Sequence, residues 1–458
     1  MNLDFIPESA KSASLGALFK GAGLMTRWLP IPQPTLLVGP GSAARLGQSI
    51  AAFGHRKILV VTDSVVSKLG LLRSLTDALT AGGAQYVVFD QITPDAPIPL
   101  VEEAIDFYRA NDCDAIVAVG GGSSMDASKA VAVSIANPRK SLRGLAGYFK
   151  GLRTPVTLYA VPTTAGTGSE VTVAAVVADP ERQTKLVIID TRIVPRMAAL
   201  DPELMTGLPP HVTAATGIDA LTHAVESYLG TWSTDYTDSM GLAAVGMIFE
   251  NLRTACRDGG NLQAREQMSL ASTFAGLAFT RANVGYVHAI AHQFGGKYHT
   301  PHGLANAIVL PHVLRFSASA VTQRLAQLAL RARLGDEGEG DDALADKFID
   351  AVVQLNRDIG IPTQLDALRE ADIPALARAA LHEAHTGYPV PRYMTQEQCE
   401  ELIRRLLPTA SAAPAAPAAP SAPRSTRKPA EKMAAAKKAA PKKVTAKRAA
   451  TKKAAPKA

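Results

Sequence analysis

Residues 117–130 read VAVGGGSSMDASKA, and this stretch decides the fold. The apolar run that enters it, Ala115–Val119, predicts a buried strand, and a helical pattern begins at Ser123 after three glycines. Glycine lets a ligand approach the backbone closely, and the free N–H groups at a helix start favour a phosphate. The stretch is neither G-x-G-x-x-G nor a P-loop, so by itself it fits a tight strand-to-helix turn as well as a pyrophosphate site.

Strand and helix signals alternate on both sides of this stretch. Upstream, KILVVTD (57–63) and YVVFD (86–90) predict strands that helices separate. Downstream, an apolar run ends in PTTAGTGSE (162–170), a second loop rich in hydroxyl groups and glycine, and short strands are expected within 171–194. This βαβ order predicts an α/β domain with a mainly parallel sheet, in which ligands bind at the carboxyl ends of the strands. Two such loops together favour a dinucleotide site.

From residue 205 to 407 the periodicity becomes helical, with few β runs, which predicts an all-helical second domain. The predicted organisation is an N-terminal extension at 1–30, a dinucleotide-binding domain at 31–204, a helical metal-binding domain at 205–408 and a tail at 409–458. The two loops lie in the first domain and the candidate ligands in the second. We therefore expect the active site in the cleft between the domains.

Two pairs of potential metal ligands have helical spacing. Asp219 and His223 are four residues apart in GIDALTHAVESY, as are His288 and His292 in VHAIAHQFGGKYHTPHG, where His302 follows. Side chains at i and i+4 point to one face of a helix. One carboxylate and three imidazoles suffice for Fe(II), Zn(II) or Ni(II) and leave a position for a substrate. The spacing predicts a metal site, although a lone histidine is more often a core residue.

Four motifs occur in a fixed order: GGGSSMDASK, PTTAGTGSEVT, GIDALTHAVE and HAIAHQFGG followed by HTPHGLANAIVLPHV. In this order they resemble the iron-containing (group III) alcohol dehydrogenases, from about Pro30 to Leu407. The family's architecture, shared with dehydroquinate synthase, agrees with the predicted α/β and all-α domains. The resemblance implies one divalent metal, Fe(II) with Zn(II) as the alternative, bound by Asp219, His223, His288 and His302.

The resemblance also implies NAD as cofactor. Asp63, at the end of KILVVTD, matches the acidic residue that faces the adenosine ribose, where an acid accepts from a 2′-hydroxyl and repels a 2′-phosphate. A strand-end helix cap is the alternative for Asp63. The remaining implied cofactor contacts are Gly121, Gly122, Ser123, Ser124, Asp126, Thr163, Thr164, Thr172, Lys185, Leu204, Gly207 and His292. His292 is either a proton relay or a cofactor-orienting contact, while His299 and His312 are interpreted as structural.

The implied activity is a metal-dependent, NAD-linked interconversion of an alcohol and an aldehyde or ketone. One alternative is a lyase similar to dehydroquinate synthase, but no Lys/Arg cluster for a phosphorylated substrate surrounds the ligands. Another is a polyanion-binding, nucleoid-associated protein on an enzyme scaffold. The chain departs from the family at Ala174, where relatives often have a larger residue, and in HTGYPVPRYMTQEQC (385–399).

The net charge of +7 is unevenly distributed. From Thr409 onward there are thirteen Lys/Arg and one acid, so the tail carries +12 and the rest of the chain −5. This Lys/Ala/Pro-rich tail resembles those of linker histones, is expected to be disordered, and predicts nonspecific binding to nucleic acid or another polyanion. Three scattered cysteines, no secretory signal and no long apolar run predict a cytoplasmic protein without a membrane span. A homo-oligomer is expected.

Overall fold

A strand that enters a glycine turn is the centre of the α/β half. The computed structural model describes residues 29–408. β4 (Ala115–Gly120) is buried along its whole length and leads into α6 (Gly122–Ala136). Gly120 has φ +150°, and a Cβ there would lie 2.5 Å from Ser124 Oγ, so only glycine fits this turn. The strand-to-helix prediction for residues 117–130 is confirmed.

The main sheet is six-stranded and entirely parallel, in the order β1-β9-β6-β4-β2-β3. Its other strands are β1 (Thr35–Val38), β2 (Lys57–Val61), β3 (Gln85–Phe89), β6 (Leu158–Pro162) and β9 (Met197–Leu200). The mainly parallel sheet is as predicted. β9, which pairs with both β1 and β6, was not anticipated.

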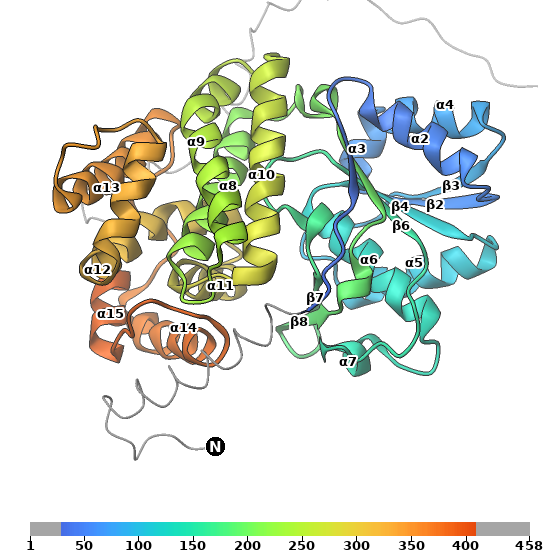
Figure 1. Cartoon of the computed structure of the whole chain (residues 1–458). Helices are drawn as coiled ribbons and strands as arrows, with labels where there is room; N and C mark the ends of the chain where they lie inside the picture. Colours follow the sequence, from blue (N-terminus) through green and yellow to red (C-terminus); the bar gives the residue numbers. More distant parts are fainter. Residues whose placement is uncertain (1–28, 409–458) are drawn as a thin grey trace, which may run out of the picture. The chain divides into compact units, whose positions relative to one another are not determined.

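Helices cover both faces of the main sheet (Figure 1). Leu59 and Val61 of β2 belong to the apolar cluster beneath α5 (Ile98–Ala110) and α6, whereas Ile58 and Val60 belong to the opposite cluster. The opposite cluster lies beneath α2 (Ser42–Ala52) and α4 (Arg73–Ala81). Successive residues of a strand point to opposite faces, so a strand covered on both sides is apolar throughout.

A second, three-stranded sheet has the order β5-β8-β7. β7 (Ala174–Asp179) and β8 (Thr184–Ile189) form an antiparallel hairpin, which confirms the short strands expected within 171–194. β5 (Gly147–Tyr148) follows the short helix α7 (Leu142–Leu145) and pairs with β8 in parallel. The pairing of these strands into a separate sheet was not predicted.

Helices alone make up the second half, and one apolar cluster joins them. They are α8 (Pro210–Leu229), α9 (Asp235–Arg257), α10 (Leu262–Ala282), α11 (Tyr286–Tyr298), α12 (His302–Arg331), α13 (Asp341–Asp358), α14 (Ile373–Gly387) and α15 (Gln396–Arg404). The predicted all-helical region is therefore confirmed.

Among the described residues, one helix is long and apolar enough to cross a membrane by length and composition alone. This helix is α12, and 61% of its apolar window is buried within the protein. It packs against α8 and α13 and contains Pro311 and a kink at Val321. These contacts make α12 a core helix of the second half.

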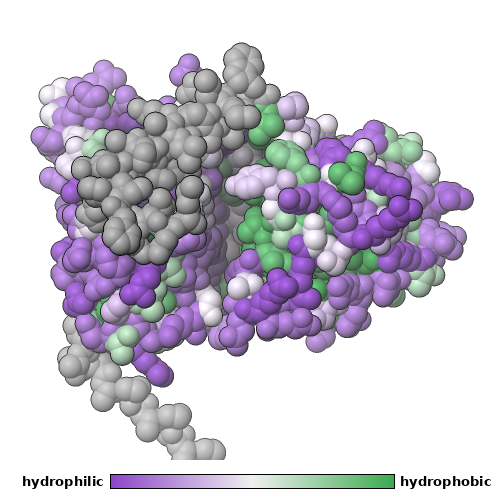
Figure 2. Space-filling view, turned by 90° about the horizontal axis from the view of Figure 1, so that it is seen from below, coloured by the Kyte–Doolittle hydropathy of each residue, from purple (hydrophilic) through white to green (hydrophobic). Residues whose placement is uncertain are grey.

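The surface seen from below in Figure 2 is mostly hydrophilic, but hydrophobic side chains gather on its α/β half. Exposed large hydrophobic residues of this half include Phe149 and Leu152, which follow β5, and Val187 of β8. Phe149 and Leu152 follow a strand of the second sheet, Val187 lies within that sheet, and all three lie outside the core clusters. The predicted extension at 1–30 lies almost wholly, and the tail at 409–458 wholly, outside the described residues. The domain boundaries stay predictions.

Candidate functional site

Three neighbouring strands end at one place in the main sheet, and each is followed by a predicted cofactor segment. β2, β4 and β6 are adjacent and parallel, so Asp63, Gly121 and Thr163 follow at the same edge. The N–H of Thr163 donates to the carbonyl of Gly120 at 3.0 Å, and a Cβ on Gly122 would lie 2.9 Å from Thr167. The structure therefore brings the two predicted loops into contact.

The start of α6 is suited to an anion. Among residues 29–408, no side chain caps this helix at Gly121, so the N–H groups of its first turn have no side-chain acceptor there. A Cβ on Gly121 would lie 3.5 Å from Thr164 Oγ1, which places a hydroxyl group of the second loop beside the helix start. Uncapped N–H groups and the helix dipole together favour a phosphate at this position.

Asp63 has a structural role in addition to its place at the sheet edge. Its Oδ1 accepts hydrogen bonds from the N–H groups of Val65 and Val66, at 2.8 and 3.0 Å, and so caps α3 (Ser64–Lys68). Its Oδ2 faces the glycine loop, 3.6 Å from where a Cβ on Gly120 would lie. One carboxylate oxygen therefore holds the helix while the other points toward the loop.

Two polar residues of α6 that were predicted to contact the cofactor form hydrogen bonds with other segments of the protein. Ser123 Oγ accepts from the N–H of Asp95 at 3.1 Å. Asp126 accepts from Ser169 Oγ at 2.7 Å and from the N–H of Val176 at 3.1 Å. Ser124 is buried. Asp126 therefore ties α6 to the second loop and to β7.

A buried lysine that the sequence analysis did not single out completes this junction. Lys129 Nζ donates to Ser169 Oγ at 3.0 Å and to Thr172 Oγ1 at 2.8 Å, and it also contacts the carbonyls of Thr172 and Ala174. Burial lowers the pKa of Lys129 to about 8, against the attraction of Asp126 and Glu170. The predicted contact Thr172 is thus held by Lys129, three residues beyond Asp126 on α6.

The remaining predicted cofactor residues are more widely spread. Lys185 of β8 donates to the side chain of Asp95 at 2.7 Å, and the backbone N–H of Asp95 donates to Ser123. Leu204 is buried in the cluster of the main sheet. Gly207 is exposed, and a Cβ there would meet nothing within 4 Å. The cluster that includes Leu204 contains Val119 and Val161, which lead into the two loops, whereas within the described residues no backbone hydrogen bond joins Gly207 to them.

The second loop lies directly against the helices that carry the ligands. A Cβ on Gly166 would lie 2.7 Å from Thr216 of α8, and one on Gly168 would lie 2.8 Å from Gly276 of α10. Thr273 of α10 also donates to Glu170 at 2.7 Å. Close backbone approach is the reason for glycine at both positions. The predicted cofactor loop and the helical half therefore share one boundary.

Four residues converge in the helical half as a metal-ligand set. Each offers one ligand atom, these atoms all lie within 4.8 Å of one another, and the residues are Asp219, His223, His288 and His302. Nε2 of His288 and Nε2 of His302 lie 3.9 and 3.5 Å from Asp219 Oδ1. Tetrahedral coordination at metal–ligand distances of about 2.0–2.1 Å separates ligand atoms by roughly 3.4 Å. The donor set therefore fits one divalent ion with little movement.

The electrostatics of the three imidazoles agree with metal binding. Burial lowers the pKa of His302 to about 4, and burial with the neighbouring histidines holds the pKa of His288 well below its ordinary value. Burial also lowers the pKa of His223, whose Nδ1 is buried without a hydrogen-bond partner among the described residues. Metal ligands must be neutral imidazoles, and an orphaned buried nitrogen is a group that an ion satisfies.

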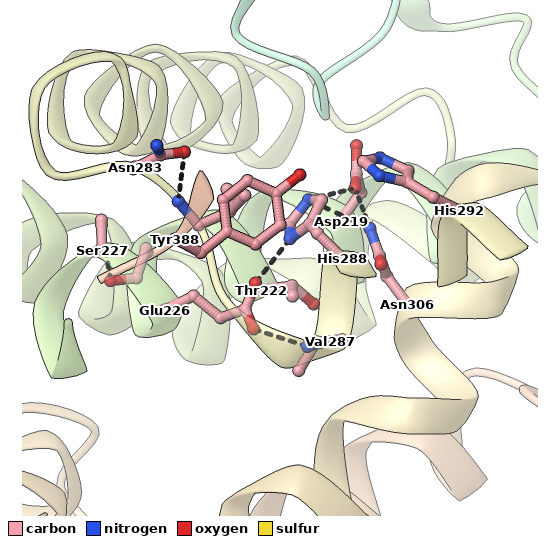
Figure 3. A network of polar contacts seen from close by, with 12 residues as sticks. Asp219, Thr222, Glu226, Ser227, Asn283, Val287, His288, His292, Asn306 and Tyr388 are labelled. Carbon is pink, nitrogen blue, oxygen red and sulfur yellow. Dashed lines mark hydrogen bonds and ion pairs between the residues drawn. The ribbon is translucent and has the colours of Figure 1, made fainter. Parts of the chain in front are cut away.

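Two residues that the sequence analysis missed orient the ligands (Figure 3). Glu226 Oε2 lies 2.6 Å from Nδ1 of His288, and Glu226 Oε1 accepts from the N–H of Val287 at 2.7 Å. Asn306 Nδ2 donates to Asp219 Oδ1 at 2.7 Å. A ligating histidine commonly donates its second ring N–H to a carboxylate, which directs the other nitrogen to the metal. Spacing could have identified both, because Glu226 is three residues after His223 and Asn306 is four after His302.

Burial raises the pKa of Glu226 to about 7, while the backbone N–H groups of Gly285, Val287 and His288 favour the carboxylate. The hydrogen-bond donors therefore oppose the effect of burial and favour the ionised form of this carboxylate.

His292 lies beside the ligand set but is not part of it. Its ring stacks on that of His302, with centroids 5.2 Å apart, and its Nδ1 is 2.6 Å from Glu383 Oε1. Of the two histidines interpreted as structural, His299 ends α11 in a left-handed conformation and His312 lies within α12. Neither belongs to the convergent group.

Comparisons with known proteins cover almost all of the described chain. Residues 33–202 match the family described as iron-containing alcohol dehydrogenase, and residues 213–407 match the C-terminal part of the Fe-containing alcohol dehydrogenase family. Lactaldehyde reductase of Escherichia coli (strain K12) is 37% identical over 373 residues, which are 80% of this chain and 96% of that protein. The 1,3-propanediol dehydrogenase of Citrobacter freundii is 39% identical, over 80% of this chain and 95% of that protein.

Solved structures give the same result. The crystal structure of a 1,3-propanediol oxidoreductase has a TM-score of 0.79 and 37% identity, and the match covers 83% of this chain and all of that chain. Sulfoacetaldehyde reductase from Bifidobacterium kashiwanohense, in complex with NAD+, has a TM-score of 0.75 and 31% identity, over 82% of this chain and 97% of that chain.

Proposed function

The chain belongs to the iron-containing alcohol dehydrogenase family, and we propose that it oxidises a small alcohol or reduces the matching aldehyde or ketone with NAD and one metal ion. It is an oxidoreductase that acts on alcohol groups. The observation that carries the proposal is the convergence of Asp219, His223, His288 and His302 within 4.8 Å. Because both halves match this family, the lyase alternative has no separate support.

The proposed metal is Fe(II), with Zn(II) as the alternative. One carboxylate and three neutral imidazoles would suit either ion. A metal in this set supplies Lewis acidity toward an alcohol or carbonyl oxygen. Glu226 and Asn306 orient His288 and Asp219 before the ion binds.

The proposed NAD site is the edge where β2, β4 and β6 end. The uncapped start of α6 offers N–H groups to the pyrophosphate, and the adjacent loop at 163–168 offers hydroxyl groups. Asp63 Oδ2 is the acceptor proposed for the ribose 2′-hydroxyl, which favours NAD over NADP. Support for NAD comes from the bound NAD+ of the related sulfoacetaldehyde reductase.

We assign His292 as the proton relay. It is partly exposed, it lies beside the ligand rings, and an imidazole can both accept and donate a proton. The alternative, a cofactor-orienting contact, uses the same position. The named relatives reduce lactaldehyde or oxidise 1,3-propanediol, so small hydroxylated aldehydes and diols form the proposed substrate class.

The test combines metal analysis with a substrate panel. The purified protein is expected to contain about one metal ion per chain and to turn over NAD(H) with short alcohols, diols or aldehydes. His288→Ala should remove both metal and turnover while the fold persists, because His288 is one of four ligands. His382→Ala, which changes an exposed histidine of α14, should retain both. Full turnover by a metal-free His288→Ala protein would contradict the metal assignment.

A further inference from the structure

The side chain of His292 is hydrogen-bonded to a residue of a helix that is distant in sequence. Glu383, near the end of α14, places Oε1 2.6 Å from His292 Nδ1. The hydroxyl of Tyr388 donates to the same oxygen at 2.5 Å, and Gln293 Nε2 donates to Oε2 at 2.9 Å. Both carboxylate oxygens thus receive hydrogen bonds, and one of the donors is the ring of the proposed relay.

The charges of this group set the form of the imidazole. Burial raises the pKa of Glu383, but the hydrogen bonds from His292, Tyr388 and Gln293 outweigh this and leave the pKa below its ordinary value. Burial and Glu383 hold the pKa of Tyr388 well above its ordinary value, so its hydroxyl stays a donor. An ionised carboxylate only accepts, hence the hydrogen of neutral His292 is on Nδ1 and the lone pair is on Nε2.

We propose that Glu383, supported by Tyr388, is a positioning residue that fixes the tautomer and ring orientation of His292 for proton transfer. The inference rests on the proposed role of His292. Tyr388 lies in HTGYPVPRYMTQEQC, the stretch that we interpreted from the sequence as less typical of the family, and Glu383 lies two residues before it. Glu383 and Tyr388 therefore lie outside the four sequence motifs that carry the family resemblance. Glu383 acts on turnover through His292 and is not one of the four residues of the metal-ligand set.

The first arm of the test is Glu383→Gln, which keeps the shape of the side chain and removes its charge. We expect kcat to fall on the order of 10-fold, part of the contribution that a well-placed acid–base group makes. KM for the alcohol and for NAD should stay within about twofold if His292 acts as a relay, because Glu383 is not among the residues assigned to either binding site. Metal content should be unchanged. Tyr388→Phe, which removes one donor to Glu383, should lower kcat by a smaller factor.

The matched control is Asp372→Asn. Asp372 also joins the end of α11 to the segment before α14, through Tyr298 at 2.8 Å and Lys297 at 2.8 Å, but it has no contact with His292. It should leave kcat near the parent value. An equal loss of kcat in Asp372→Asn and Glu383→Gln would mean that loosening of α11 against α14 causes the effect, and would overturn the proposal.

A double-mutant cycle separates this inference from the proposed function. If Glu383 works through His292, Glu383→Gln should have no further effect on kcat in a His292→Gln background. Additive losses, or an unchanged kcat in Glu383→Gln beside an impaired His292→Gln, would overturn the positioning role and leave the relay standing. An unimpaired His292→Gln would overturn the relay itself and, with it, the role of Glu383.

Discussion

Asp63 combines two functions that different substitutions separate. Asp63→Asn keeps a side-chain oxygen for the N–H groups of Val65 and Val66 but removes the charge, so stability should hold while the preference for NAD over NADP relaxes. Asp63→Ala should relax the preference too and also lose about 1 kcal/mol of stability, because the helix cap is gone. Steady-state kinetics with both cofactors and urea unfolding check these outcomes.

An unchanged cofactor preference in both variants would leave Asp63 with the capping role alone. Equal destabilisation by Asn and Ala would show that the charge, and not the hydrogen bond, holds the start of α3.

At the scale of single residues, helical spacing predicted a metal site, but the ligand set with His302 and without His292 followed from the family resemblance. Asp219 and His223 share a face of α8, and the structure brings them together with His288 and His302. The same spacing reaches Glu226 and Asn306, which the sequence analysis passed over. It does not reach Glu383, because α14 approaches His292 only through the tertiary fold, 91 residues along the chain. A contact of this kind has no local signature.

At the scale of secondary structure, Arg143 of α7 anchors the β7–β8 hairpin, because it pairs with Asp179 at the end of β7 and with Glu181 in the turn. Nε and Nη2 of Arg143 in α7 donate to the two oxygens of Asp179, at 2.7 and 2.9 Å, where the Asp179 side chain is buried. These hydrogen bonds lower the pKa of Asp179 to about 2. Stabilisation from a lowered carboxylate pKa is complete above the unfolded value of 3.8 and is lost as the pH falls toward about 2.

Arg143→Ala should therefore lower the thermal midpoint by several degrees at pH 7, and the difference from the parent protein should disappear as the pH approaches 2. Arg182→Ala is the matched control, because Arg182 lies 3.9 Å from the same carboxylate and is 66% exposed. Its effect should be small. Thermal unfolding followed by circular dichroism from pH 7 to pH 2 distinguishes the two variants. Equal midpoints for both variants at pH 7 would contradict the anchoring role.

The helices and strands that the sequence predicted are those whose apolar residues form a long pattern on one face or fill the whole segment. β2, β4 and the helices after residue 210 have apolar periods that local sequence reveals. β5 has two residues and β9 has four, and the partners of both are distant in sequence. Such short strands are stabilised by pairing with neighbouring strands of the sheet. The apolar periodicity of a single segment does not reveal that pairing.

At the scale of the whole molecule, the chain divides its charge between a folded part and a basic tail. Residues 409–458 carry +12 beside −5 for the remainder, and the relatives are matched by about 80% of the chain. A basic segment that neutralises phosphates releases counterions, so its affinity for DNA should fall steeply with salt. The tail contains no aromatic residue to stack on bases, and sequence preference should therefore be weak.

A chain that ends at Pro408 tests this division. It should keep full turnover, because the metal-ligand set and both cofactor loops lie before residue 304. It should lose the DNA retention that the full chain shows at low salt. A control chain of full length, with the tail lysines replaced by glutamine, should behave like the truncated one, since charge and not length attracts the polyanion. Equal DNA retention by the full and truncated chains would place any binding on the folded part, and lost turnover in the short chain would mean that the enzyme extends past residue 408.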